Sequence, residues 1–334
     1  MNADGTQVIS GSDDKTARIT ALTGGVKRPP YEAGGSVRKA AFSRDGKKVV
    51  IGVENGPFCI LDLATNSKEC RDPSGLVSVA FSPDGAAVLT GTHENLAILW
   101  PAESMRQQPL LQLKGHDDWV FHASFSRDGS KIVTTSKDNT ARLWSVEHTR
   151  DAWALKQPPV VLPHPDRVMN AAFSSDGLLV ATACADKEAR LWKTDGTTVP
   201  LREFPHLSDV FSVAISSDGK WLLTASDDQT AKVWFIDNGD EFLSLNHGWA
   251  VRSAVFGPGD TSVITGADDG NVRLWHLGAQ DLAQYMSQAS TACLTLQERV
   301  RYLGESTDTA ASGYRACEVE HKRTDPAFGL PSTR

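Results

Sequence analysis

One seven-residue pattern recurs along this chain at intervals of about forty residues. It consists of two small or β-branched residues, an aromatic residue, Ser, a variable residue, Asp and Gly, as in residues 123–129. Successive Asp positions lie 41, 39, 44, 48, 42 and 41 residues apart, counting Gly259 in a degraded last copy. The copies begin at residues 40, 79, 123, 171, 213 and 254, and Asp4-Gly5 matches the end of one more. Such a period indicates an array of similar units that pack against one another.

Each copy continues in the same way. An apolar run ends at the Asp-Gly pair, which favours a tight hairpin, and a second short strand follows, such as residues 131–136. A polar turn at 137–139 leads to a third strand, 140–144, that ends in Trp, and a weaker fourth run precedes the next copy. Four short antiparallel strands per unit are typical of a propeller blade. The slot that ends the third strand explains five of the nine tryptophans: Trp100, Trp144, Trp192, Trp234 and Trp275.

These repeated residues resemble the WD-repeat family of β-propellers over residues 1–278. Two copies depart from the pattern, with Thr20 and Leu61 in the Trp slot. The resemblance implies an all-β, seven-bladed WD-type propeller, followed by a short α-helical extension over residues 279–334. The expected repeats are about 1–34 (partial), 35–73, 74–114, 115–163, 164–205, 206–246 and 247–278.

The first repeat is incomplete. Residues 7–16 match residues 131–140, so Met1 falls just ahead of a second strand and the first blade lacks its innermost strand. No convincing fourth strand follows Leu277. A ring with these edges would be unusual, and two explanations stay open. Either the chain is the C-terminal part of a longer protein with upstream repeats, or the first and last blades close by side-chain packing.

A His, an Asp and a Trp recur at fixed spacing in four repeats, with Asp 22 residues after His and Trp six residues after Asp. A catalytic interpretation would use Thr134 or Ser136 as a nucleophile beside the His–Asp pair. A catalytic set, however, occurs once in a chain, and this one occurs four times. The family resemblance implies a structural hydrogen-bond network instead. Its members are His116, Asp138, Trp144, His164, Asp186, Trp192, His206, Asp228, Trp234, His247, Asp269 and Trp275.

Composition narrows the function further. The formal net charge is −7, which argues against a broad electrostatic grip on nucleic acid. No apolar run reaches membrane-helix length, and the N-terminus has no export signal. The five widely spread cysteines, with no Cys-x-x-Cys pair, predict reduced thiols in a cytoplasmic protein rather than a disulfide framework. The scattered remaining histidines predict no metal site, and we expect no cofactor.

The last 56 residues follow a different pattern. Residues 281–286 and 293–304 predict short helices, the second with a capping box from Thr295 to Glu298. This stretch is similar to tails that follow the propellers of large bacterial signalling proteins. Cys293 and Cys317 either form a disulfide or thiol switch, or simply pack a small helical cap.

We therefore predict a monomeric, non-catalytic scaffold or sensing module that binds a protein or peptide, as part of a larger signalling protein. The alternatives are a structural spacer and a propeller hydrolase, for which no non-repeated acid–base cluster is visible. In the family, partners generally bind the face that carries the His and Asp turns. The residues expected there are Arg38, Ser78, Phe121, Met169, Phe211 and Arg252, with Trp119 and Trp249 nearby. Inter-blade packing is the alternative role for Phe121 and Phe211.

Overall fold

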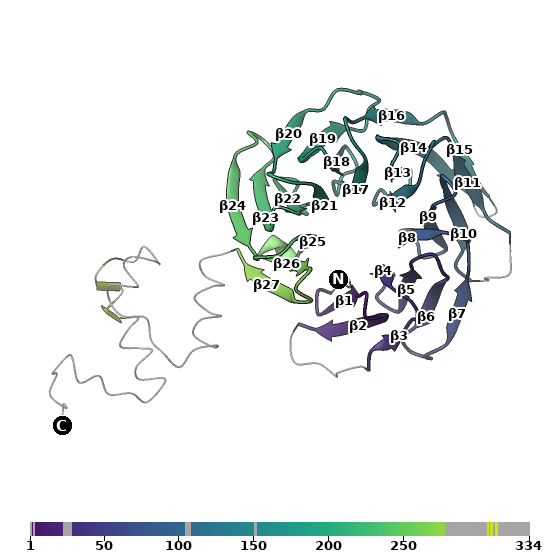
Figure 1. Cartoon of the computed structure of the whole chain (residues 1–334), viewed down its shortest axis with the longest axis horizontal. Coiled ribbons are helices and arrows are strands. Elements are labelled where there is room, and N and C mark those ends of the chain that lie inside the picture. Colours follow the sequence, from purple (N-terminus) through teal and green to yellow (C-terminus); the bar gives the residue numbers. More distant parts are fainter. Residues whose placement is uncertain are drawn as a thin grey trace. The chain divides into compact units, whose positions relative to one another are not determined.

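The computed structural model describes residues 2, 4–22, 29–103, 108–149, 152–277, 306, 308–309 and 311–312. Its strands form seven antiparallel sheets that follow one another in chain order around a ring (Figure 1). The predicted seven-bladed β-propeller is confirmed. Within each sheet the strands run in chain order from the centre outward, so each blade is a local meander.

The first three blades span residues 7–114. Blade one contains β1 (Gln7–Gly11), β2 (Thr16–Ala21) and β3 (Tyr31–Glu32). Blade two contains β4 (Val37–Phe42), β5 (Lys48–Val53), β6 (Phe58–Asp62) and β7 (Lys68–Arg71). Blade three contains β8 (Leu76–Phe81), β9 (Ala87–Thr92), β10 (Leu96–Pro101) and β11 (Leu111–Lys114).

The other four blades span residues 120–276. Blade four contains β12 (Val120–Phe125), β13 (Lys131–Ser136), β14 (Thr140–His148), β15 (Trp153–Leu155) and β16 (Val160–Pro163). Blade five contains β17 (Val168–Phe173), β18 (Leu179–Cys184), β19 (Glu188–Lys193) and β20 (Arg202–Pro205). Blade six contains β21 (Val210–Ile215), β22 (Trp221–Ser226), β23 (Thr230–Phe235) and β24 (Glu241–Asn246). Blade seven contains β25 (Val251–Phe256), β26 (Ser262–Ala267) and β27 (Val272–His276), with a short 3-10 turn, Pro258–Asp260, between the first two.

Blade four has a strand that the repeat pattern does not predict. Strand β14 runs on to His148, and β15 pairs with this extension as a small hairpin. Trp153 on β15 is buried, stacks on His148 with ring centroids 4.1 Å apart, and lies 5.6 Å from Phe125. This hairpin occupies the longest insertion between repeats.

The core lies between blades, because each sheet packs one face on the next sheet. Between blades five and six, Leu191 and Phe204 contact Leu222 and Trp234, and all four side chains are buried. Full burial of one such side chain stabilises the folded chain by about 1.5–3 kcal/mol. A blade therefore depends on its neighbours for stability.

The first and last blades, which meet in the ring, each have three strands in the described structure. Blade one has three strands in the described structure, which confirms the missing innermost strand. Gly5 lies so close to Pro258 that a Cβ atom there would be 2.0 Å from Pro258 Cγ, so the two ends of the ring touch at this turn. Val272 and Leu274 of β27 are 54% and 42% exposed, whereas Val233, on the matching strand of blade six, is fully buried.

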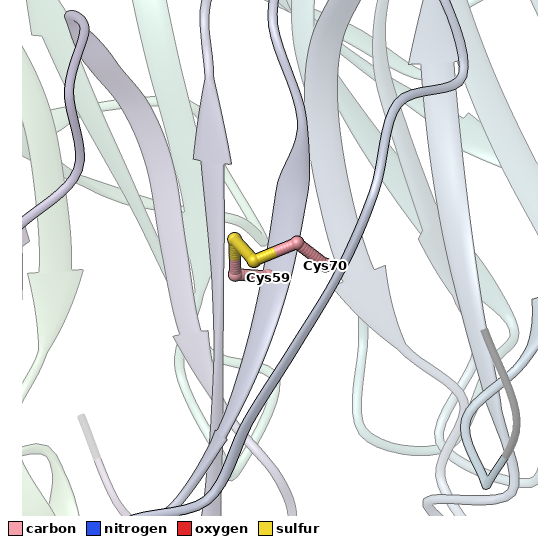
Figure 2. The surroundings of a disulfide bond; sticks show 2 residues. All are labelled: Cys59 and Cys70. Atoms are coloured by element: carbon pink, nitrogen blue, oxygen red, sulfur yellow. A yellow bond between two sulfur atoms is a disulfide. The ribbon is translucent and has the colours of Figure 1, made fainter.

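A disulfide links Cys59 and Cys70, so the prediction that these cysteines are reduced thiols is wrong (Figure 2). The two residues lie directly opposite each other on the antiparallel strands β6 and β7. Opposed side chains on neighbouring strands are close enough for a bond between their sulfur atoms. Cys184 is free and buried, and burial raises the pKa of its thiol to about 12, so this thiol is unreactive.

We expect reduction of this disulfide to lower the free energy of unfolding by about 2 kcal/mol, because the bond closes a short loop in the unfolded chain. Cys59 and Cys70 are only 11 residues apart, and β7 is an outer strand. Thermal melting with and without dithiothreitol measures the effect. The Cys70→Ser variant is the control and should no longer respond to the reductant. Identical melting curves for the native chain in both conditions would contradict a stabilising disulfide.

The chain divides into two compact units, residues 1–274 and 275–334. The second unit carries the C-terminal predictions, namely the helices at 281–286 and 293–304 and the roles of Cys293 and Cys317, and these lie outside the described residues. In the described part of the chain, no helix has both the length and the apolar character needed to cross a membrane.

Candidate functional site

The repeated polar residues form a closed network in blade four. Thr134 on β13 is its centre, with Oγ1 2.7 Å from Nε2 of His116 and 2.9 Å from Nε1 of Trp144. Nδ1 of His116 lies 2.8 Å from Oδ2 of Asp138. A carboxylate only accepts hydrogen bonds, so Nδ1 donates to Asp138, and a neutral ring then accepts the Thr134 hydroxyl proton at Nε2. The Thr134 side chain is fully buried, which leaves no hydroxyl available to attack a substrate.

The carboxylate in this network receives several donors. Besides His116, the Thr140 hydroxyl donates to Asp138 at 2.6 Å and the backbone N–H of Asp117 donates at 3.0 Å. Burial raises the pKa of Asp138, but the hydrogen bonds from His116 and Thr140 outweigh it and hold the pKa well below its usual range. Blade six repeats this arrangement with His206, Asp228, Thr224 and Trp234.

Blades five and seven depart from the expected His–Asp pair. Nδ1 of His164 donates to the carbonyl of Leu162 at 3.0 Å, and Asp186 instead pairs with Arg190, 2.7 Å away. In blade seven, likewise, Nδ1 of His247 donates to the Leu245 carbonyl and Asp269 pairs with Arg273. The network prediction therefore needs correction for the His–Asp pairs of blades five and seven. His164 and His247 still bond the repeated threonines through Nε2, but Asp186 and Asp269 are each held by an arginine four positions later.

Blade five lacks one of the donors that the carboxylates of blades four and six receive. In blades four and six, the residue after the histidine, Asp117 or Leu207, donates its backbone N–H to the carboxylate. In blade five that residue is Pro165, which has no N–H. Asp186 thus lacks one donor, and the buried guanidinium of Arg190 replaces it. Burial also lowers the pKa of His164 to about 4, so this ring is neutral at pH 7.

The shared element of the network is a Thr–Trp hydrogen bond. In four blades the indole N–H donates to a threonine ten positions earlier, at 2.9–3.0 Å, and blade three has this bond although no histidine opens its repeat. Sequence analysis named Thr134 but missed its equivalents, and their constant spacing from Trp was the available signal. The pairs are Thr90–Trp100, Thr134–Trp144, Thr182–Trp192 and Thr224–Trp234. Trp275 lies at the same place on β27.

The face with the His and Asp turns carries exposed aromatic side chains. Trp119 is 39% exposed and stacks on His93 of blade three, with ring centroids 3.9 Å apart. The Phe121 ring lies edge-on to the Trp119 indole, with ring centroids 6.5 Å apart. The Lys137 ammonium lies 4.6 Å from the centroid of the Trp119 ring. Contacts on several sides fix this exposed indole in one position.

A second group lies on the same face of blades six and seven. The Arg252 guanidinium is 4.1 Å from the ring centroid of Phe211 and donates two hydrogen bonds to Asp268, at 2.9 and 2.6 Å. Trp249, at the start of blade seven, is 61% exposed. The remaining predicted residues take other roles: Met169 is half-buried on β17, and Arg38 pairs with Glu54 at 2.8 Å.

The inner strand of blade three corrects one predicted residue. Strand β8 begins at Leu76, and an irregularity between Leu76 and Ser78 shifts the pairing with β9. Val77, half-buried, therefore takes the place that corresponds to Phe121, and Ser78 is buried. The described residues contain no cluster of three or more His, Cys, Asp or Glu side chains that could hold a metal ion.

Comparison with known proteins agrees with this geometry. Residues 107–145, 156–193, 198–234 and 241–276 match the family "WD domain, G-beta repeat". These four segments are similar to WD repeats. They include the Thr–Trp bonds of blades four to six and the four repeated histidines. Propellers of WD repeats are generally non-catalytic modules that bind protein partners.

Curated relatives share only part of these repeats. The chain is 30% identical over 133 residues to human angio-associated migratory cell protein, covering 34% of this chain and 30% of that protein. It is 28% identical over 90 residues to human echinoderm microtubule-associated protein-like 2, covering 25% of this chain and 14% of that protein. The chain therefore spans less than a third of the length of these relatives.

Proposed function

We propose that this propeller is an interaction platform that binds a protein or peptide through the face carrying the His and Asp turns. The observation that carries the proposal is the pair of exposed tryptophans, Trp119 and Trp249. Trp119 lies beside Phe121, and Trp249 precedes by three residues Arg252, which contacts Phe211. Tryptophan, other aromatic residues and arginine supply most of the binding energy at protein interfaces.

Preorganisation supports the same proposal. The stack with His93 and the Lys137 cation hold Trp119, and the double hydrogen bond to Asp268 holds Arg252 over Phe211. Side chains that are already ordered lose little entropy when a partner binds. The cations on this face have acidic neighbours, as in the pairs Arg252–Asp268 and Arg167–Asp209, so the surface is mixed in charge. We therefore favour a partner that contributes apolar or aromatic anchors.

The alternatives differ in what they require. A hydrolase would need an accessible nucleophile, and the repeated hydroxyls beside the histidines of blades four and six are fully buried. A spacer would need no binding surface, yet Trp119 and Trp249 are exposed. A role as a monomeric scaffold within a larger signalling protein is a prediction from the sequence. A cytoplasmic location is another, and it would require Cys59 and Cys70 to withstand a reducing compartment.

Affinity capture with paired variants tests the platform. The variants are Phe121→Ala with Phe211→Ala, and Trp119→Ala with Trp249→Ala. The matched control is Phe235→Ala with Phe242→Ala, which removes two exposed aromatic rings from the outer strands of blade six. We expect cross-linked partners of the native chain to persist with the control and to be lost, by about tenfold or more, with both test pairs. Test variants that melt normally and retain every partner would reject this face as the binding site.

A further inference from the structure

A cavity of about 290 Å³ lies at the opposite end of the ring, beside the Asp-Gly turns of blades two to four. Its wall is formed by residues of three inner strands, which include Ala41, Ala80 and Ser124 and the phenylalanine that ends each strand, and by the turn residues Arg44, Pro83 and Arg127. Ligand cavities usually begin at about 300 Å³, so this one suits a small molecule or a charged group rather than a folded partner.

The two arginines occupy one slot of the repeat, between Ser and Asp in the turn. In blades two and four the slot holds Arg44 and Arg127, on either side of Pro83 in blade three, and blades five and six have serine there. Neither arginine forms an ion pair in the described structure, and the wall of this cavity contains no acidic side chain. Both arginines are exposed, and they also line the adjoining pocket, which contains Asp84 and Asp128.

Buried polar atoms without partners lie beside the cavity. Oγ of Ser124 is buried and has no hydrogen-bond partner. The same holds for Nδ1 of His122, two residues earlier on the same strand. Oγ of Ser78, on the neighbouring inner strand, is a third such atom, and its side chain is 1% exposed. An unsatisfied buried polar atom costs about 1–3 kcal/mol. Such atoms are therefore candidates for binding a ligand.

A further cation lies in the same region of the channel. Lys39 has no acidic partner in the described structure, and its side chain is half-buried, which lowers the pKa of the ammonium. Burial, reinforced by the Lys39 charge, lowers the pKa of His122 to about 3, so the histidine is neutral at pH 7 and adds no positive charge of its own. Residues 39, 78 and 122 each precede by two positions residues 41, 80 and 124 on the same strands. Because alternate residues of a strand share one face, the two sets lie on the same face, with the first set deeper in the channel.

We propose that this cavity is a binding site for a small phosphate-bearing ligand, with Arg44 and Arg127 holding the phosphate oxygens and Ser124 donating from the wall. A guanidinium group presents paired N–H donors that match two phosphate oxygens, and two such groups suit a multivalent anion better than a single carboxylate. Lys39 extends the donor set inward. The site is distinct from the aromatic face at the other end of the ring and does not depend on the partner proposed for it.

Calorimetric titration of the full chain with inorganic pyrophosphate at low salt tests the site. We expect binding that weakens about tenfold or more in Arg44→Gln and in Arg127→Gln, and severalfold in Ser124→Ala. Lys220→Gln is the matched control, because it removes the same charge at the Asp-Gly turn of blade six, where Lys220 pairs with Asp218. These are surface or small changes, so each variant should melt within about 0.5 kcal/mol of the native chain.

The opposing outcomes are equally specific. No binding of pyrophosphate at millimolar concentration would overturn the proposal, as would unchanged affinity in the Arg44→Gln, Arg127→Gln double variant. Equal weakening by Lys220→Gln would show a general charge effect instead of a site. Citrate serves as a multivalent carboxylate probe, and citrate binding as tightly as pyrophosphate would reject phosphate as the ligand class.

Discussion

Replacing His116 by alanine is expected to lower the free energy of unfolding by about 3–5 kcal/mol. The side chain is fully buried, and its removal leaves the Thr134 hydroxyl without one partner and the buried Asp138 carboxylate without its strongest donor. Removing a donor from a buried carboxylate is costly, because the charge of Asp138 stays out of water with fewer hydrogen bonds. The Thr140 hydroxyl and the Asp117 N–H still donate to Asp138 and limit the loss.

His164→Ala is the matched comparison within the same chain. His164 makes the same bond to a threonine, but its Nδ1 donates to a neutral carbonyl, and Asp186 keeps Arg190. Its removal should therefore cost less than that of His116, about 1–3 kcal/mol. Urea unfolding of both variants at pH 7 measures the two values. No loss in His116→Ala would contradict a structural network, and equal losses would show that the His–Asp pair adds nothing.

The repeats predict the fold well because they report strand order and strand length directly. The hairpin signal at each Asp-Gly turn and the Trp at the end of each third strand place β13 at residues 131–136, as the structure does. The β15 hairpin escapes this reasoning because it occurs once. A strand that belongs to a single blade has no second copy with which to align it.

Constant spacing places residues near one another but does not choose their hydrogen-bond partners. A spacing of 22 residues separates His164 from Asp186 and also His116 from Asp138. Only His116 forms a hydrogen bond with its Asp, whereas His164 donates to the Leu162 carbonyl. Pro165 removes a donor and Arg190 supplies another, although Arg142, at the equivalent place in blade four, forms no ion pair with Asp138 in the described structure. Which donor pairs with each Asp follows from the competition between nearby donors in three dimensions, which the spacing along the sequence does not report.

The disulfide and the phosphate cavity depend on register and on ring geometry. Cys59 and Cys70 can be paired only once β7 is aligned with β6, and β7 has the weak pattern of an outer strand. Arg44 and Arg127 are far apart in the sequence and meet because blades two and four flank blade three. Neither arrangement has a local sequence signal.

Acidification from pH 7 to pH 4 is expected to destabilise the propeller, with about 3 kcal/mol of the loss arising from His164 alone. Burial lowers the pKa of this histidine from 6.5 to about 4 in the folded chain. Between these two pH values the unfolded chain binds a proton that the folded chain excludes, so stability falls as the pH falls. Above pH 6.5 the imidazole is neutral in both states, and the His164 contribution is complete.

The Asp138 and Asp228 carboxylates affect the free energy of unfolding in a separate, more acidic pH range. Burial opposes their ionisation, but hydrogen bonds from the histidines and threonines hold both pKa values well below 3.8. Their contribution is therefore complete above about pH 4 and is lost only at lower pH, as each folded carboxylate takes up a proton. The two windows can be distinguished by pH.

His164→Gln separates the histidine contribution, because it removes the titrating ring while keeping a polar side chain beside Thr182. Melting temperatures at half-unit steps from pH 7 to pH 3 should fall less steeply for this variant than for the native chain down to about pH 4, and the two curves should become parallel toward pH 3. Because His122 and His247 also have lowered pKa values, the variant should keep part of the slope. Curves that run parallel throughout the range from pH 6.5 to pH 4 would show that His164 is protonated equally in both states, and would refute its burial as a neutral ring.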